Sequence, residues 1–269
     1  MVFVMTMSER SDWASLEVPF GLDGIRQVIL GEPTIHHGMS PACVLPSPAI
    51  DLVCATGKPL RAPWGDADMV LHRSFHAADW LPEFQVEAFR LAILPVAFTP
   101  SFDGVLQRDG THPVPSLIRD PLQDARTGAF SYDRLEILKI LDRIVRAPDC
   151  RPLTAVATEV IGSVSALPGW TVERWSRELG VSSRTLERAT RKSTGLPPKR
   201  LLSIRRLETA IGRLNQKIPL AQLAFECGYT DQSHMGKQFM RETGCSGTRL
   251  RALREQNRIV GRMVDNLAI

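Results

Sequence analysis

Residues 218–248 constrain this chain more than any other stretch, because their pattern predicts two short helices joined by a tight turn. Apolar residues recur at helical spacing over residues 220–227, and Gly228 can take the positive φ that ends such a helix. Thr230 or Asp231 can then cap a second helix, since a short oxygen-bearing side chain accepts hydrogen bonds from its first N–H groups. The outward positions of that helix are small or hydrogen-bonding, which suits a DNA major groove, and the spacing is that of a helix-turn-helix.

The same helix–Gly–helix pattern occurs once more, over residues 170–196. Gly180 ends its first helix, and Ser182 or Ser183 caps the next one. Between the two copies, residues 198–215 carry one apolar stripe at steps of three and four, which predicts a continuous helix of about 27 Å. Two recognition helices placed at its ends can reach successive major grooves, which lie about 34 Å apart on one face of B-DNA.

Charge is distributed unevenly along the 269 residues. Residues 170–269 hold 19 Lys and Arg against 9 Asp and Glu, a net charge of +10, and the remaining residues hold 14 basic and 20 acidic side chains, a net charge of −6. This asymmetry predicts a polyanionic partner for the basic half alone. Five scattered cysteines without a CxxC pair favour reduced thiols in the cytoplasm. The opening residues lack a signal-peptide pattern, and no apolar run reaches the ~18 residues of a membrane span.

Short apolar runs broken by proline and glycine fill residues 24–122 and predict a β-rich domain. The runs cover residues 25–30, 49–55, 69–75 and 88–93. The density of prolines excludes long helices from this part of the chain. Helical spacing returns at residues 132–146 and 153–166, which predict two connecting helices. Everything after Gly169 is predicted to be helical, without a strand.

Residues 172–253 resemble the DNA-binding domain of the AraC/XylS family of transcription regulators. The resemblance is carried by ELGVSSRTLERATRKSTGLPPKRLLSIRRLETA and, more specifically, by LAFECGYTDQSHMGKQFMRETG. It implies two helix-turn-helix units joined by a linker helix, and parts of the amino-terminal half are more weakly similar to a domain of the same regulators. The chain departs from the family pattern at Thr190, where a large apolar residue is usual, and at Gly247, where proline is usual. Gly236 also lowers helix propensity by about 1 kcal/mol inside the second recognition helix.

Helical spacing and the resemblance together place eleven side chains towards DNA. Arg184 and Arg188 can donate to guanine edges or phosphates, and the alternative is that Arg188 pairs with Glu187 or Glu173 on a solvated face. Glu187 either accepts from a cytosine amino group or positions Arg184 and Arg191, the interpretation that we favour. Asp231 is assigned to capping because phosphates repel a carboxylate. His234 either donates to DNA or packs against the first helix of its unit, the interpretation that we favour. The predicted DNA-binding residues are Ser183, Arg184, Glu187, Arg188, Arg191, Lys192, Gln232, Ser233, His234, Lys237 and Arg241. Further candidates for phosphate contacts are Lys199, Arg200, Arg205 and Arg206.

Two other functions fit parts of the pattern. A β-barrel enzyme or an alkyl-acceptor DNA-repair protein with an appended DNA-binding domain would need a metal site or a reactive cysteine. His72 and His76 would lie about 13 Å apart on one strand face, too far to share a metal ion. Of the cysteines in the acidic half, Cys150 alone has a basic neighbour. The third hypothesis is a protein-binding module that acts through the apolar face of residues 132–146, with DNA incidental.

The sequence therefore predicts an α+β protein with a β-rich, cupin-like domain followed by an all-α domain of two helix-turn-helix units. Residues 1–130 form the sensor domain, 131–168 the connecting helices with a candidate dimer contact, 169–256 the DNA-binding domain and 257–269 a tail. The predicted partners are double-stranded promoter DNA, a small-molecule effector, RNA polymerase and a second copy of the chain. No catalytic residue, metal ion, cofactor or membrane contact is predicted.

Overall fold

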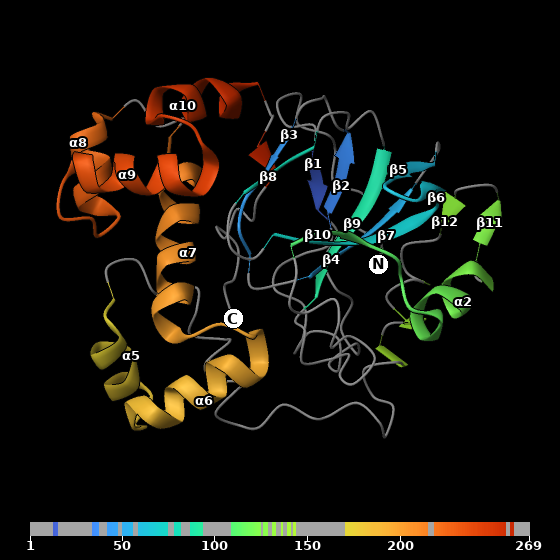
Figure 1. Ribbon diagram of the computed structural model, residues 1–269, viewed down its shortest axis with the longest axis horizontal. Helices are drawn as coiled ribbons and strands as arrows, with labels where there is room; N and C mark the ends of the chain where they lie inside the picture. The colour runs from blue at the N-terminus through green and yellow to red at the C-terminus, as the bar shows by residue number, and fades with distance from the viewer. Residues whose placement is uncertain are drawn as a thin grey trace, which may run out of the picture.

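The computed structural model has a β-rich amino-terminal part beside a helical carboxy-terminal part (Figure 1). It describes residues 13–15, 34–37, 42–47, 50–55, 59–74, 78–81, 87–93, 109–124, 126–128, 131–132, 136, 139–140, 142–143, 170–214, 218–256 and 259–260. The order of the two parts is the one that the sequence predicts, with strands first and helices after them.

A six-stranded antiparallel sheet forms the centre of the amino-terminal part. Its strands follow the order β1 (Trp13–Ser15), β2 (Thr34–His37), β9 (Glu87–Ile93), β4 (Ile50–Ala55), β7 (Met69–Arg73) and β10 (Gly110–His112). Every residue of β4 and β7 is buried, so both faces of these strands are covered, although Asp51, His72 and Arg73 interrupt their apolar runs. Three of the four predicted runs are confirmed as strands, and the run at 25–30 lies outside the described residues.

Three smaller sheets and one short helix complete the described part of this region. They are the sheet of β13 (Ile259–Val260), β3 (Ala42–Val44) and β8 (Asp79–Leu81), the pair of β5 (Leu60–Ala62) and β6 (Gly65–Ala67), the pair of β11 (Arg126–Gly128) and β12 (Ser131–Tyr132), and helix α2 (Ser116–Asp124). Helix α2 contains Pro121 and has nine residues, in keeping with the predicted absence of long helices here.

The prediction that no strand follows Gly169 is wrong, because β13 pairs in parallel with β3. Ile259 stands opposite Cys43, and Val260 stands opposite Val44. A two-residue strand has no periodicity of its own, and its partner lies more than 200 residues earlier in the chain. Local sequence patterns therefore could not predict strand β13.

The connecting helices predicted over residues 132–146 and 153–166 lie largely outside the described residues. Tyr132 ends strand β12 instead of beginning the first helix. Five described residues between 136 and 143 are helical, and Ile140 among them is buried, as expected for the apolar face of such a helix. The second predicted helix lies wholly outside the described residues.

Six helices make up the described carboxy-terminal part. They are α5 (Val172–Glu178), α6 (Ser183–Thr194), α7 (Pro198–Gly212), α8 (Leu220–Glu226), α9 (Gln232–Thr243) and α10 (Gly247–Glu255). We call α5 and α6 the first helix pair, and α8 and α9 the second helix pair. Figure 1 shows α7 between the two pairs. With 15 residues, α7 is about 22 Å long, somewhat shorter than the predicted helix.

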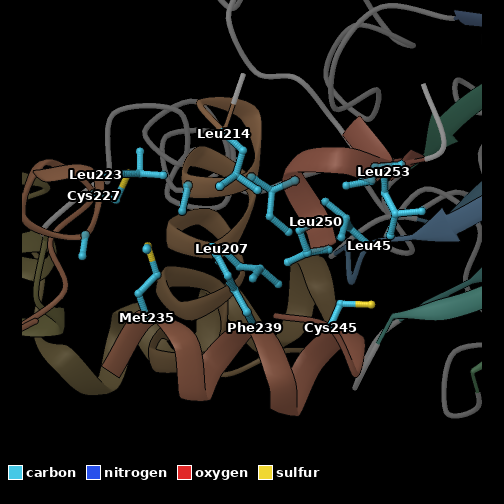
Figure 2. Packing of buried hydrophobic residues seen from close by; sticks show 14 of the residues in the cluster. Leu45, Leu207, Leu214, Leu223, Cys227, Met235, Phe239, Cys245, Leu250 and Leu253 are labelled. Atoms are coloured by element: carbon cyan, nitrogen blue, oxygen red, sulfur yellow. The ribbon is translucent and has the colours of Figure 1, made fainter. Parts of the chain in front are cut away.

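The apolar stripe predicted on α7 is buried along its whole length and is shared by two cores. Its first half enters a cluster with the first helix pair, in which Leu201 and Ile204 join Trp175 and Leu186. Its second half enters a larger cluster with the second helix pair and α10, shown in Figure 2, whose members include Leu207, Leu214, Leu223, Met235, Phe239 and Leu250. Because one rigid helix contributes to both cores, it holds the two helix pairs in a defined relation.

Candidate nucleic-acid interface

The two helix pairs are built by the same local signals. In each pair the tight turn falls on a glycine with positive φ, Gly180 at 62° and Gly228 at 73°, as predicted. The Ser182 hydroxyl caps α6 by accepting from a first-turn N–H at 3.1 Å, and the Asp231 carboxylate caps α9 in the same way at 2.7 Å. Of the predicted alternatives, Ser182 and Asp231 are thus the caps. The Asp231 carboxylate is hydrogen-bonded to the amino-terminal end of α9, as predicted.

The solvent-facing surface of α6 is formed by the six side chains predicted for it. All are exposed: Ser183, Arg184, Glu187, Arg188, Arg191 and Lys192. Glu187 accepts from Arg191 at 3.0 Å, whereas Arg184, the other arginine that it was expected to position, is not paired with it. No acidic side chain among the described residues lies within ion-pair distance of Arg184 or Arg188. Their guanidinium groups are consequently available to an external anion.

Thr190 stands on the opposite, inward face of α6 and is fully buried. Its hydroxyl donates to the carbonyl oxygen of Glu187 at 3.0 Å. A buried hydroxyl without a partner would cost about 1–3 kcal/mol. The hydrogen bond within the helix removes this cost, so the departure from the family pattern at Thr190 leaves the first core intact.

The exposed surface of α9 carries the five residues predicted for it, together with Met240. Gln232, Ser233, His234, Lys237 and Arg241 are all exposed. Met235 and Phe239 point the other way, into the second core, as the helical spacing predicts. Gly236 is half-buried, and a Cβ added there would meet nothing within 4 Å.

His234 packs against Tyr229, which follows the turn of the second helix pair. The two rings meet edge to face with centroids 5.5 Å apart, while the guanidinium of Arg206 lies 5.5 Å from the centroid of the Tyr229 ring. Burial raises the pKa of the Tyr229 phenol, so the ring is neutral at physiological pH. His234 was expected to pack against the first helix of its unit, but its ring is exposed and meets the ring of Tyr229 instead. Its exposed ring can still meet a ligand at the start of α9.

Arg241 of α9 and Arg200 of α7 both donate hydrogen bonds to the carboxylate of Glu242. The buried Glu242 side chain accepts from Arg241 at 2.8 Å and from both terminal nitrogens of Arg200, each at 2.8 Å. Burial by itself would raise the pKa of Glu242, but hydrogen bonds from Arg200 and Arg241 outweigh it and hold that pKa below its ordinary value. Glu242 was missed by the sequence analysis. An Arg-Glu pair in a helix gives no local sign that the glutamate is buried.

The phosphate candidates on α7 are only partly available. Arg205 is buried and pairs with Glu208 at 2.7 Å, so its selection as a phosphate contact is wrong. Arg200 is largely committed to Glu242, and Arg206 lies over Tyr229. Lys199 is exposed. Three of these four cations thus contact other side chains of the helical part, and Lys199 alone of the four is exposed.

The alternative functions would need a metal site or a reactive cysteine. No three His, Cys, Asp or Glu side chains among them are placed to hold a metal ion. Cys43 and Cys54 are fully buried, and burial raises the pKa of the Cys54 thiol, the reverse of what a reactive cysteine needs. Cys150 and His76 lie outside the described part of the chain. Among the described residues, no helix is long and apolar enough to cross a membrane.

Comparisons with known proteins agree with this geometry. A family described as a helix-turn-helix domain matches residues 175–252. Over 86 residues the chain is 29% identical to the virulence regulon transcriptional activator VirF of Yersinia enterocolitica, covering 32% of each protein. Over 86 residues it is 35% identical to the HTH-type transcriptional activator RhaS of Pectobacterium carotovorum subsp. carotovorum (strain PC1), covering 28% of this chain and 31% of RhaS.

Among solved structures, ToxT from Vibrio cholerae is similar at 13% identity and a TM-score of 0.41, with 78% of this chain and 92% of ToxT covered. The chain spans about a third of the length of the curated relatives that it matches. The sequence likeness to those relatives therefore concerns one domain of each protein.

Proposed function

We propose that this chain, whose residues 175–252 form an AraC-type helix-turn-helix domain, is a sequence-specific DNA-binding transcription regulator. The observation that carries the proposal is the pair of exposed faces on α6 and α9. Eleven side chains suited to reading DNA stand exposed on two helices of the same build, and both helices are anchored to α7. VirF and RhaS are named as transcriptional activators, which supports activation as the direction of control.

In this proposal each helix pair is a helix-turn-helix unit, and α6 and α9 are its recognition helices. Arg184 and Arg188 donate to guanine edges or phosphates, and Gln232 suits an adenine edge. Lys237 and Arg241 neutralise phosphates, which position the helix without specifying sequence. The capped amino-terminal ends of both helices also favour anions, because several of their first N–H groups have no partner within the helix.

Two recognition helices on one chain give an asymmetric reader of DNA. Helix α7 is about 22 Å long, and its two halves enter different cores. Successive major grooves on one face of B-DNA lie about 34 Å apart. We propose that α6 and α9 enter two such grooves, so that a single chain covers a site for which a simple helix-turn-helix protein needs a dimer.

The amino-terminal part is proposed as the regulatory domain. We assign residues 1–130 to a cupin-like sensor, supported by the antiparallel sheets, and residues 131–168 to connecting helices that can also pair two chains. A small-molecule effector can act there only by binding one arrangement of the protein better than another. Contact with RNA polymerase belongs to the same proposal, as the means by which a bound activator acts.

The test is binding to duplexes selected by the wild type from a random library, measured by fluorescence anisotropy at several salt concentrations. Arg184→Ala should weaken the selected duplex by about tenfold or more, since a bidentate base contact contributes about 1–3 kcal/mol. Lys237→Ala should weaken all duplexes alike and reduce the slope of log affinity against log salt by about 1. Arg119→Ala on α2 removes the same charge from an exposed site elsewhere and should change neither. Unchanged binding by both recognition-helix variants would contradict the proposal and favour the protein-binding alternative.

A further inference from the structure

The β-rich part and the helical domain share one apolar cluster. Cys43 and Leu45, which belong to the amino-terminal part, are buried together with Leu250 and Leu253 of α10. Figure 2 shows Leu45 entering this cluster on the side of those two leucines. Ile259 of β13, which pairs with β3, belongs to the same cluster. The carboxy-terminal strand thus ties the helical domain to a strand of the amino-terminal part.

Arg73 makes a second connection, at the end of the first recognition helix. It is the last residue of β7 and is fully buried, and its guanidinium donates to the carbonyl oxygen of Thr194 at 3.4 Å. Thr194 is the last residue of α6, where a cation stabilises the free carbonyls of a helix. Burial lowers the pKa of Arg73 to about 10, so its guanidinium stays protonated at neutral pH.

Ala78 makes the third connection, at the end of the second recognition helix. This residue directly precedes β8, and its backbone N–H donates to the carbonyl oxygen of Glu242 at 2.6 Å. The Glu242 side chain in turn holds Arg200 of α7 and Arg241 of α9. Arg73 and Ala78 are five residues apart in the chain, yet they bond the carboxy-terminal turns of α6 and α9 respectively.

We propose that Arg73, Ala78 and strand β13 form an interdomain brace that fixes α6 relative to α9, and that the braced arrangement is the one that binds a bipartite DNA site. The inference rests on the proposed function. All eleven candidate DNA-binding side chains are exposed while the brace is in place, because it contacts the ends of the recognition helices and leaves their outer faces open. The amino-terminal part then sets the distance and the relative rotation between the recognition helices α6 and α9.

A spacing rule makes the brace testable on DNA. One added base pair between two groove contacts moves the second by about 3.4 Å along the axis and about a tenth of a turn around it. A braced protein cannot follow this displacement, whereas a protein free to move about α7 can follow more of it. The probes are therefore the selected duplex and the same duplex with one base pair inserted between its two contact regions.

Two full-length variants alter the brace in opposite directions. Ile259→Asp places a charge in the shared cluster and should release β13. Ile259→Cys places a thiol opposite the native Cys43, so that mild oxidation can lock the pairing, since neighbouring strands bring Cα atoms within disulfide reach. Trp64→Asp adds the same charge at an exposed apolar position away from the brace and is the matched control. Peptide mapping under non-reducing conditions verifies the lock, and circular dichroism verifies folding.

The wild type and oxidised Ile259→Cys should bind the selected duplex equally, and each should lose about tenfold or more on the inserted duplex, within the usual range of coupling between sites. Ile259→Asp should bind the selected duplex about fivefold or more weakly and should discriminate the two duplexes less. The brace is refuted if folded Ile259→Asp behaves as the wild type, or if the oxidised lock abolishes binding that its reduced form retains. If the wild type selects no sequence at all, the proposed function fails instead.

Discussion

Thr190 and Glu242 show how single residues support the exposed faces without belonging to them. Each is buried on the inward face of a recognition helix and has its polar group hydrogen-bonded, Thr190 by the carbonyl of Glu187 in the same helix and Glu242 by Arg241 and by Arg200 of α7. Helical spacing, together with the family resemblance, placed the eleven outward side chains, because exposure on an amphipathic helix follows its period. It could not show that Glu242, or the Arg205–Glu208 pair within α7, is buried, since burial depends on what neighbouring elements present.

Gly236 is a residue at which stability can be raised. Gly236→Ala should increase the free energy of unfolding by about 1 kcal/mol, because glycine disfavours a helix interior and the added Cβ meets nothing within 4 Å. Gly244→Ala is the matched control: at φ 69° an alanine is strained, and the substitution should cost about 1–2 kcal/mol. Urea unfolding followed by far-ultraviolet circular dichroism measures both. A loss of stability in Gly236→Ala would show that the added methyl group is not accommodated.

Glu242 should make stability depend on pH in the acidic range. Its folded-state pKa lies below the ordinary value of 4.5, so its stabilisation is complete above that pH and is lost as the pH falls through the folded-state pKa. At pH 7, Glu242→Gln should lower the free energy of unfolding by about 3 kcal/mol, because it breaks a buried ion pair. The difference between variant and wild type should shrink below about pH 4.5. A difference that stays constant from pH 7 to pH 3 would contradict this account of Glu242.

At the scale of elements, the helices of the two helix pairs and α7 were predictable, because their boundaries depend on residues close together in the sequence, whereas α2 was not predicted. Caps, turn glycines and apolar stripes lie within a few residues of one another, so one pass along the sequence finds them. Strand β13 was not predictable, because two residues carry no period and their partner is β3. Tyr132, the predicted start of the first connecting helix, lies in strand β12 instead.

The caps of the two recognition helices should contribute equally. Ser182→Ala and Asp231→Ala should each lower the free energy of unfolding by about 1 kcal/mol, since each side chain accepts from a first-turn N–H. Ser183→Ala is the control, because the neighbouring Ser183 does not cap α6 and its removal should change stability by less than about 0.5 kcal/mol. Equal losses for Ser182→Ala and Ser183→Ala would show that the cap is misassigned.

At the scale of the whole molecule, two levels of organisation meet at α7 and at the interdomain brace. The division into an acidic, β-rich part and a basic, helical part was predictable from composition and periodicity. The docking of the two parts was not, because it depends on Arg73, Ala78 and Ile259 meeting residues far away in the sequence. In this account one chain carries two recognition helices whose relation is set by α7 and by the amino-terminal part.

The most direct test of the central claim is a hydroxyl-radical footprint of the full-length protein on a selected duplex, combined with the stoichiometry of the complex. One chain per site should protect two different sequences about 10 base pairs apart on one face of the DNA, because α6 and α9 enter successive major grooves. Protection of a single groove by one chain, or of two symmetric half-sites that require two chains, would contradict the bipartite reader.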